Sequence, residues 1–113
     1  MINLAPNIYR QRLVIEAYPK KPINDDDIKK YLSGLSVAVG MKQLIEPVTH
    51  CSDIYGWAGW IHWETSGAHF YAWNQPILFY SVDIYTCKAF DPQVAISYTK
   101  QFFDSDTIEY KEF

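Results

Sequence analysis

The chain has 113 residues, of which 49% are hydrophobic and 17% aromatic, and its formal net charge is −3. This length fits a single domain over residues 1–113, and so high an aromatic share argues against disorder. The negative net charge does not attract a phosphate backbone, so no nucleic-acid partner is expected.

The two cysteines, Cys51 and Cys87, are too few for a disulfide framework. No apolar run approaches the roughly 18 residues that a membrane-spanning helix requires. The N-terminus lacks the basic segment and apolar run of a secretion signal. We therefore expect a cytoplasmic protein with reduced thiols and no membrane contact.

The first predicted elements are a strand and a helix. Residues 9–18 alternate apolar and polar side chains, which predicts a strand that Pro19 ends. Asn24 is suited to cap a helix, because three aspartates follow it in the first turn. Gly40 is a plausible end of that helix. Its apolar residues have helical spacing: Ile28, Tyr31, Leu32 and Leu35.

Four strands are predicted next, over residues 43–50, 56–63, 69–73 and 77–86. The strand over 56–63 is expected to carry an aromatic face of Trp57, Trp60 and Trp63. Ser66-Gly67 and Asn74-Gln75-Pro76 are typical of turns. These successive strands favour pairing with their neighbours in one antiparallel sheet.

Asp91-Pro92 predicts the start of a second helix, with Ala95, Tyr98 and Phe102 on one face. Residues 107–111 form a short closing strand. The order β-α-β-β-β-β-α-β indicates the α+β class, a two-layer sandwich with two helices on one face of an antiparallel sheet. The opposite face is expected to be aromatic. Six aromatic residues are too many for one small core, so some should contact a second protomer: Trp57, Trp60, Trp63, Phe70, Phe79 and Tyr80.

Generic motifs say little about chemistry, since the chain has no Walker loop, dinucleotide fingerprint or His-Glu-x-x-His pair. His50, His62 and His69 match no zinc spacing, so no metal is expected. Taken alone, Cys87 is more often a buried small hydrophobe than a reactive thiol. Alternation turns Glu16 toward solvent, and Ser66 alone marks only a turn.

Several short segments nevertheless occur in a distinctive order. They are Arg-Leu-Val-Ile-Glu-Ala-Tyr at 12–18, His50 with Tyr-Gly-Trp-Ala-Gly at 55–59, Thr65-Ser66, Trp73, Val-Asp-Ile-Tyr-Thr-Cys at 82–87, and Asp91-Pro92. This ordered set resembles the bacterial and archaeal S-adenosylmethionine decarboxylases, which depend on a pyruvoyl group and serve polyamine (spermidine) biosynthesis.

The resemblance implies that the chain cuts itself before Ser66, which becomes a pyruvoyl cofactor and an electron sink for decarboxylation. Cys87 would return a proton to the substrate carbon. Glu16 and Trp73 would lie near the substrate. The resemblance also implies a homodimer with its sites at the interface and S-adenosylmethionine as the ligand, for which aromatic rings suit both the adenine and the sulfonium.

The chain departs from the family at several positions. Thr65 and Gly67 replace the usual neighbours of the serine, Ala58 replaces a serine that assists cleavage, and Tyr71 replaces a histidine. The position of a substrate-binding carboxylate holds Gln75. Tyr71 could still donate through its phenol, and His69 could supply an imidazole.

Three readings follow. The first is a pyruvoyl-dependent S-adenosylmethionine decarboxylase with Ser66 as its cofactor source. The second is an uncut relative, either a lyase in which Glu64 or His69 acts as a base on S-adenosylmethionine, or a decarboxylase of arginine or ornithine. The third is an inactive partner subunit that regulates an active homologue.

Overall fold

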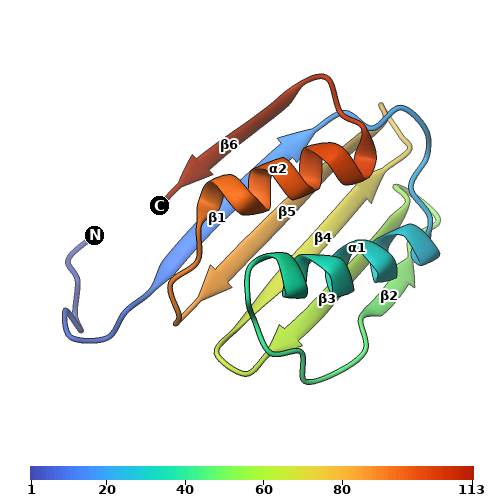
Figure 1. The fold of residues 1–113 in the computed structure, drawn as a ribbon. Coiled ribbons are helices and arrows are strands. Elements are labelled where there is room, and N and C mark those ends of the chain that lie inside the picture. The colour runs from blue at the N-terminus through green and yellow to red at the C-terminus, as the bar shows by residue number, and fades with distance from the viewer.

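The computed structural model describes residues 1–113, and the element order matches the prediction. Strands β1 (Gln11–Ala17), β2 (Val48–Cys51), β3 (Trp57–Trp63), β4 (Ser66–Trp73), β5 (Phe79–Thr86) and β6 (Ile108–Glu112) form one sheet in the order β2-β3-β4-β5-β1-β6. Every neighbouring pair is antiparallel. Helices α1 (Asp25–Ala38) and α2 (Pro92–Phe103) cover one face (Figure 1), which confirms the two-layer α+β sandwich.

Local signals explain both helices. In α1 the Asn24 side chain accepts from the Asp27 N–H at 2.9 Å, and the Asp27 carboxylate accepts from the Asn24 N–H at 3.2 Å. This reciprocal capping box satisfies two free donors of the first turn. The chain leaves α1 at Gly40, whose φ of 71° suits glycine. Asp91 caps α2 and Pro92 is its first residue, as expected.

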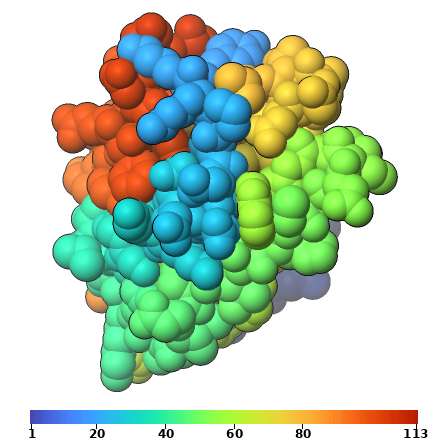
Figure 2. Space-filling model, turned by 90° about the vertical axis from the view of Figure 1, so that its right-hand side faces the viewer, coloured from blue at the N-terminus to red at the C-terminus, as the bar shows by residue number.

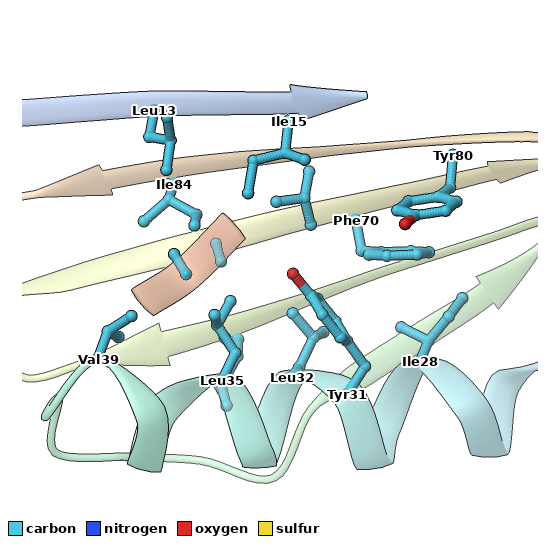
Figure 3. Close-up of a cluster of buried hydrophobic side chains, with 14 of the residues drawn as sticks. Leu13, Ile15, Ile28, Tyr31, Leu32, Leu35, Val39, Phe70, Tyr80 and Ile84 are labelled. Atoms are coloured by element: carbon cyan, nitrogen blue, oxygen red, sulfur yellow. The ribbon is translucent and has the colours of Figure 1, made fainter. Parts of the chain in front are cut away.

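The core lies between the helices and the sheet (Figure 3). Helix α1 packs on β3, β2 and α2, and its Ile28, Leu32 and Leu35 belong to one core cluster with the inward residues of β1 and β5, where aromatic rings fill one end. The rings of Phe70 and Tyr80 stack with centroids 5.5 Å apart, and Tyr31 lies 5.2 Å from Phe70. No buried side-chain polar atom lacks a partner. The indole of Trp63, for example, donates to the Ser36 hydroxyl at 2.7 Å.

Three expectations about the elements were wrong. Trp57, Trp60 and Trp63 do not share a face, since strand alternation points Trp63 into the core and leaves Trp60 39% exposed on the other side. The strand predicted over 43–50 is only Val48–Cys51, because Pro47 interrupts it, and Gln43 makes an isolated bridge to Trp63.

The third correction concerns α2, whose buried residues are Ala95, Ile96 and Thr99. Tyr98 and Phe102 turn toward α1 instead, where each ring lies 5.4 Å from that of Tyr31. The buried face of α2 therefore lies about one residue from the face expected from Ala95, Tyr98 and Phe102, because α2 packs against both the sheet and α1.

The face of the sheet opposite the helices, here called the open face, is uncovered in this chain. It combines aromatic rings with charged and imidazole side chains. Its residues on the four central strands are Ala58, Trp60 and His62 from β3, Gly67, His69, Tyr71 and Trp73 from β4, Phe79, Ser81, Asp83 and Tyr85 from β5, and Arg12, Val14 and Glu16 from β1.

Candidate active site

Ser66 is the first residue of β4, not part of a turn as predicted. The hairpin between β3 and β4 turns at Glu64 and Thr65, and Ser66 pairs with Trp63 across it. The fourth strand thus begins three residues earlier than expected. The Thr65–Ser66 peptide bond lies where this tight turn enters the strand.

Cys87 lies beside this bond. Ser66 pairs with Thr86, the last residue of β5, and the next N–H along the chain, that of Cys87, donates to the Thr65 carbonyl at 2.9 Å. The Cys87 side chain is exposed and forms no disulfide, so it is not the buried small hydrophobe that its type suggests in isolation. The serine and the cysteine are 21 positions apart in the sequence, and β-pairing brings them together.

The Ser66 hydroxyl has few partners. It lies 3.0 Å from the Thr65 hydroxyl, and both hydroxyls lie 3.7 Å from the Met41 sulfur. The Met41 thioether is a weak acceptor, so the main hydrogen bond of the Ser66 hydroxyl is the one that it shares with the Thr65 hydroxyl. The sequence analysis considered Thr65 only as the residue before Ser66 and did not select Met41, because ordinary residue types carry no signal of this contact.

An open cavity lies beside Thr65 and Ser66. Gly67 faces Tyr85 on one side and His62 on the other, and because it has no side chain it leaves a hollow between them. The cavity is lined by His62, Thr65, Ser66, Gly67, His69, Asp83 and Tyr85. Two of the site residues predicted from sequence, Ser66 and His69, line this cavity, and Glu64 and Cys87 lie next to the Thr65–Ser66 bond outside the lining. These four residues are called the turn cluster below.

Two charged residues that the sequence analysis did not select border the turn cluster. Asp83 lies directly across from His69, and Arg12 binds both of its carboxylate oxygens at 3.0 and 2.9 Å. This hydrogen-bonded pairing, followed by the charge of Asp83, raises the pKa of Arg12. Strand alternation and the register of the β4–β5 hairpin were the signals that could have placed Asp83 opposite His69.

His69 and Tyr71 are neighbours on the open face of β4, as alternation predicts. The imidazole Nδ1 lies 3.1 Å from the Tyr71 phenol oxygen, so the two side chains share a hydrogen bond. Neither side chain is buried, so the packing of the core does not require the bond. An imidazole and a hydroxyl linked in this way can together accept and donate a proton.

The remaining predicted residues, Glu16, Tyr71, Trp73 and Gln75, lie farther along the sheet and are called the far cluster. Trp73 contacts the Phe79 ring, with centroids 5.3 Å apart. Glu16 pairs with Ser81 on one side and Glu109 on the other. Gln75 belongs to the loop over residues 74–78 (Figure 2), which lies against the β2–β3 loop because the Asn74 N–H donates to the Tyr55 carbonyl at 2.8 Å.

The two clusters touch through the His69–Tyr71 hydrogen bond, but Ser66 is separated from the far cluster along the strand. Five residues of extended chain place Ser66 and Tyr71 about 17 Å apart. Their side chains also project on opposite faces of β4, since the sequence separation is odd. Ala58 pairs directly with Tyr71, so it too lies far from Ser66. One copy of the chain therefore does not bring Tyr71 to the Thr65–Ser66 bond.

Comparison with protein families identifies the chain. The model of the S-adenosylmethionine decarboxylase family matches residues 11–113. The chain belongs to the S-adenosylmethionine decarboxylase family. No curated protein gives a significant match.

A solved structure shares the fold of this family member. The crystal structure of the adenosylmethionine decarboxylase from Aquifex aeolicus VF5 matches with a TM-score of 0.75 at 17% sequence identity. The match covers 94% of this chain and 89% of that chain. Neither helix here is long and apolar enough to span a lipid bilayer.

The turn cluster of this decarboxylase-like protein suits a pyruvoyl group made from Ser66. The partners of the Ser66 hydroxyl are the Thr65 hydroxyl and the Met41 sulfur, with no carboxylate or carbonyl among them, and the Thr65 carbonyl that it would attack already accepts a hydrogen bond. The adjoining cavity provides space at the new chain end. No group of three or more His, Cys, Asp or Glu side chains is arranged to hold a metal ion.

Proposed function

We propose that this protein decarboxylates S-adenosylmethionine with a pyruvoyl group made from Ser66, as a cytoplasmic enzyme of polyamine biosynthesis. One observation carries the proposal. The sheet places Ser66, the Thr65 carbonyl and Cys87 at the same end of the β4–β5 ladder, with a 2.9 Å hydrogen bond between the Cys87 N–H and that carbonyl. Membership of the decarboxylase family supports the same reaction.

The cofactor would arise from the chain itself. The Ser66 oxygen attacks the Thr65 carbonyl carbon, the C–N bond breaks, and the hydroxyl proton passes to the released nitrogen, which leaves an ester. Loss of the Ser66 α-proton then expels the Thr65 carboxylate. Water replaces the nitrogen, which leaves as ammonia. The resulting ketone supplies an electron sink for the electron pair that stays on the substrate carbon when carbon dioxide leaves.

Cys87 fits the role of proton donor. Its exposed thiol follows directly from the residue paired with Ser66, so it lies beside the new chain end. A positioned thiol can return a proton to the substrate carbon after carbon dioxide has left.

We propose that the far cluster completes the site of a second copy. The open face carries rings that a single chain leaves partly exposed, including Trp60, Tyr71 and Tyr85. Partly exposed aromatic rings set among polar side chains are typical of an interface. In a face-to-face homodimer the far cluster of one copy can approach the turn cluster of the other. Tyr71 and Trp73 of one copy would then border the open-face cavity beside the Thr65–Ser66 bond of the other copy.

The rings of the far cluster also suit the substrate. Trp73 and Phe79 offer flat surfaces on which an adenine can stack, and aromatic faces attract the cationic sulfonium. Glu16 adds a carboxylate on the same face, where it can accept hydrogen bonds from ribose hydroxyls or an amine.

Carbon dioxide release from carboxyl-labelled S-adenosylmethionine tests the reaction. The wild type should release label, and Ser66→Ala, which removes the nucleophile, should release none. Labelled arginine and ornithine test the other decarboxylations. Wild-type protein that releases no label from S-adenosylmethionine would contradict the proposal, and release from arginine or ornithine alone would favour the other decarboxylations.

A second candidate is favoured by the His69–Tyr71 hydrogen bond. An imidazole in an open cavity, linked to a phenol, can act as a base on bound S-adenosylmethionine without any cut in the chain. This lyase reading predicts product formation that survives Ser66→Ala and is lost in His69→Gln. A regulatory subunit would show neither product.

A further inference from the structure

The side chain of Thr65 contacts the Ser66 nucleophile directly, with the two hydroxyl oxygens 3.0 Å apart. We propose that the Thr65 hydroxyl is a catalytic group of the self-cleavage, which relays the Ser66 proton to the nitrogen that leaves. The residue on one side of the cut would then assist the nucleophile on the other side. This inference rests on the proposed function and assigns the proton transfer of its first step.

Strand alternation separates the Ser66 hydroxyl from the imidazoles that border the site. Ser66 lies an even number of residues from Phe70, which is fully buried, so both side chains project toward the covered face. Its contact with the sulfur of Met41, a residue of the core, agrees with this direction. His62 and His69 lie on the open face. Neither imidazole of the chain is therefore on the side where the Ser66 proton must be taken up.

The other hydroxyl on this side of the sheet is engaged elsewhere. Thr86 lies directly across from Ser66 and is fully buried, but its hydroxyl donates to the Gln11 carbonyl at 3.4 Å. The Ser66 hydroxyl has only two partners, the Thr65 hydroxyl and the Met41 sulfur. The Thr65 hydroxyl is the stronger proton acceptor of these two, because a thioether is a weak one.

A hydroxyl suits this relay because it can accept one proton while it donates another. As the Ser66 oxygen bonds to the Thr65 carbonyl carbon, its proton passes to the Thr65 hydroxyl oxygen. The proton that this hydroxyl already carries passes to the Ser66 nitrogen. The C–N bond then breaks with its electron pair on the nitrogen, which leaves an ester and a free amine. Thr65 ends the step with as many protons as it had at the start.

The position of the Thr65 hydroxyl favours the second transfer. Only the Cβ, Cα and carbonyl carbon of Thr65 separate this oxygen from the Ser66 nitrogen, so a rotation of one side chain suffices. Before the reaction the Thr65 hydroxyl also lies 3.7 Å from the Met41 sulfur. Because that contact is weak, little is lost when the hydroxyl turns from the sulfur to the nitrogen.

Two variants of Thr65 separate its hydroxyl from its shape. Thr65→Val keeps the branched shape and loses the hydroxyl, whereas Thr65→Ser keeps the hydroxyl and loses the methyl group. Thr107→Val is the matched control, since Thr107 is also exposed but lies at the opposite end of the sheet. The uncut fraction is followed over time by denaturing mass spectrometry after new synthesis is stopped, and folding by thermal melting.

We expect Thr65→Val to cleave about 100-fold more slowly than the wild type, because it lacks the proton relay. Thr65→Ser should recover most of the lost rate, and Thr107→Val should cleave like the wild type. Cleavage of folded Thr65→Val as fast as that of Thr107→Val would overturn the assignment and leave the decarboxylase proposal intact. Equal slowing in Thr65→Val and Thr65→Ser would also overturn it, since the shape and not the hydroxyl would then matter. Wild-type protein that stays uncut would overturn both this inference and the proposed function.

Discussion

The two faces of the sheet have similar kinds of residues and opposite environments. On the covered face Trp63, Phe70 and Tyr80 are fully buried beneath the helices. On the open face Trp60 and Tyr71 are about 40% exposed and alternate with imidazole and carboxylate groups. Aromatic richness therefore stabilises the fold on one side and is available for association and binding on the other.

Phe70→Ala should cause the largest loss. Its ring contacts Tyr31, Tyr80 and Phe103, and truncation leaves a cavity that costs about 3–5 kcal/mol. The matched change on the open face, Trp60→Ala, should cost at most about 0.5 kcal/mol in the isolated chain. Urea denaturation of both variants, at concentrations too low for dimerisation, measures the two losses of free energy of unfolding. Equal losses would contradict the difference between the covered and open faces.

Alkaline pH should cause the next largest loss of free energy of unfolding, through tyrosines buried under the covered face. Burial raises the pKa of Tyr31 and Tyr80, and that of Tyr98 to about 12, because a phenolate is poorly solvated there. A folded-state pKa above the unfolded value means that stability is complete below about pH 10 and falls as the pH rises past it. Urea midpoints between pH 8 and pH 12 should decline above pH 10, and Tyr98→Phe should reduce the decline.

Ser36→Ala should cost about 1–3 kcal/mol, because it leaves the buried indole N–H of Trp63 without an acceptor. Its control is Ser33→Ala on the same helix, where the hydroxyl accepts only a 3.5 Å contact from Gln43. Thermal melting of the two variants provides the comparison. A Ser36→Ala protein as stable as Ser33→Ala would show that the bond contributes nothing.

Cys87→Ala should leave the free energy of unfolding nearly unchanged, since the side chain is exposed. Its effect should appear in turnover, which we expect to fall about 100-fold if the thiol donates a proton. Full activity on S-adenosylmethionine would make Cys87 a structural residue.

The open face should be needed for dimerisation, in contrast to the covered face. Trp60→Glu places a charge in the proposed interface and should convert a dimer to a monomer at micromolar concentration without unfolding it. Sedimentation velocity measures the change. A wild type that is already monomeric would contradict the homodimer.

The sequence was sufficient for much of the covered face. The capping pattern at Asn24 and the helical spacing from Ile28 to Leu35 are local signals, and the structure confirms them. Trp60 was misplaced because spacings of three residues suggest a shared face on a helix, whereas a strand alternates every two residues.

The site was less accessible to sequence reasoning, because its arrangement depends on register. Ser66-Gly67 resembles a turn locally, but Trp63 must point into the core, where it binds Ser36, and this fixes the turn at Glu64 and Thr65. The Cys87 hydrogen bond follows from the same register. Family resemblance could select Ser66 and Cys87, but only the folded sheet shows that they are neighbours.

The central claim is that the Thr65–Ser66 bond breaks, and the intact mass of the purified protein under denaturing conditions tests it most directly. We predict two fragments, residues 1–65 and residues 66–113. The second fragment should lack the nitrogen of Ser66 and should begin with a ketone that reacts with a hydrazine. Ser66→Ala should remain one chain. A single wild-type species of full-length mass after prolonged incubation, indistinguishable in processing from Ser66→Ala, would contradict the account.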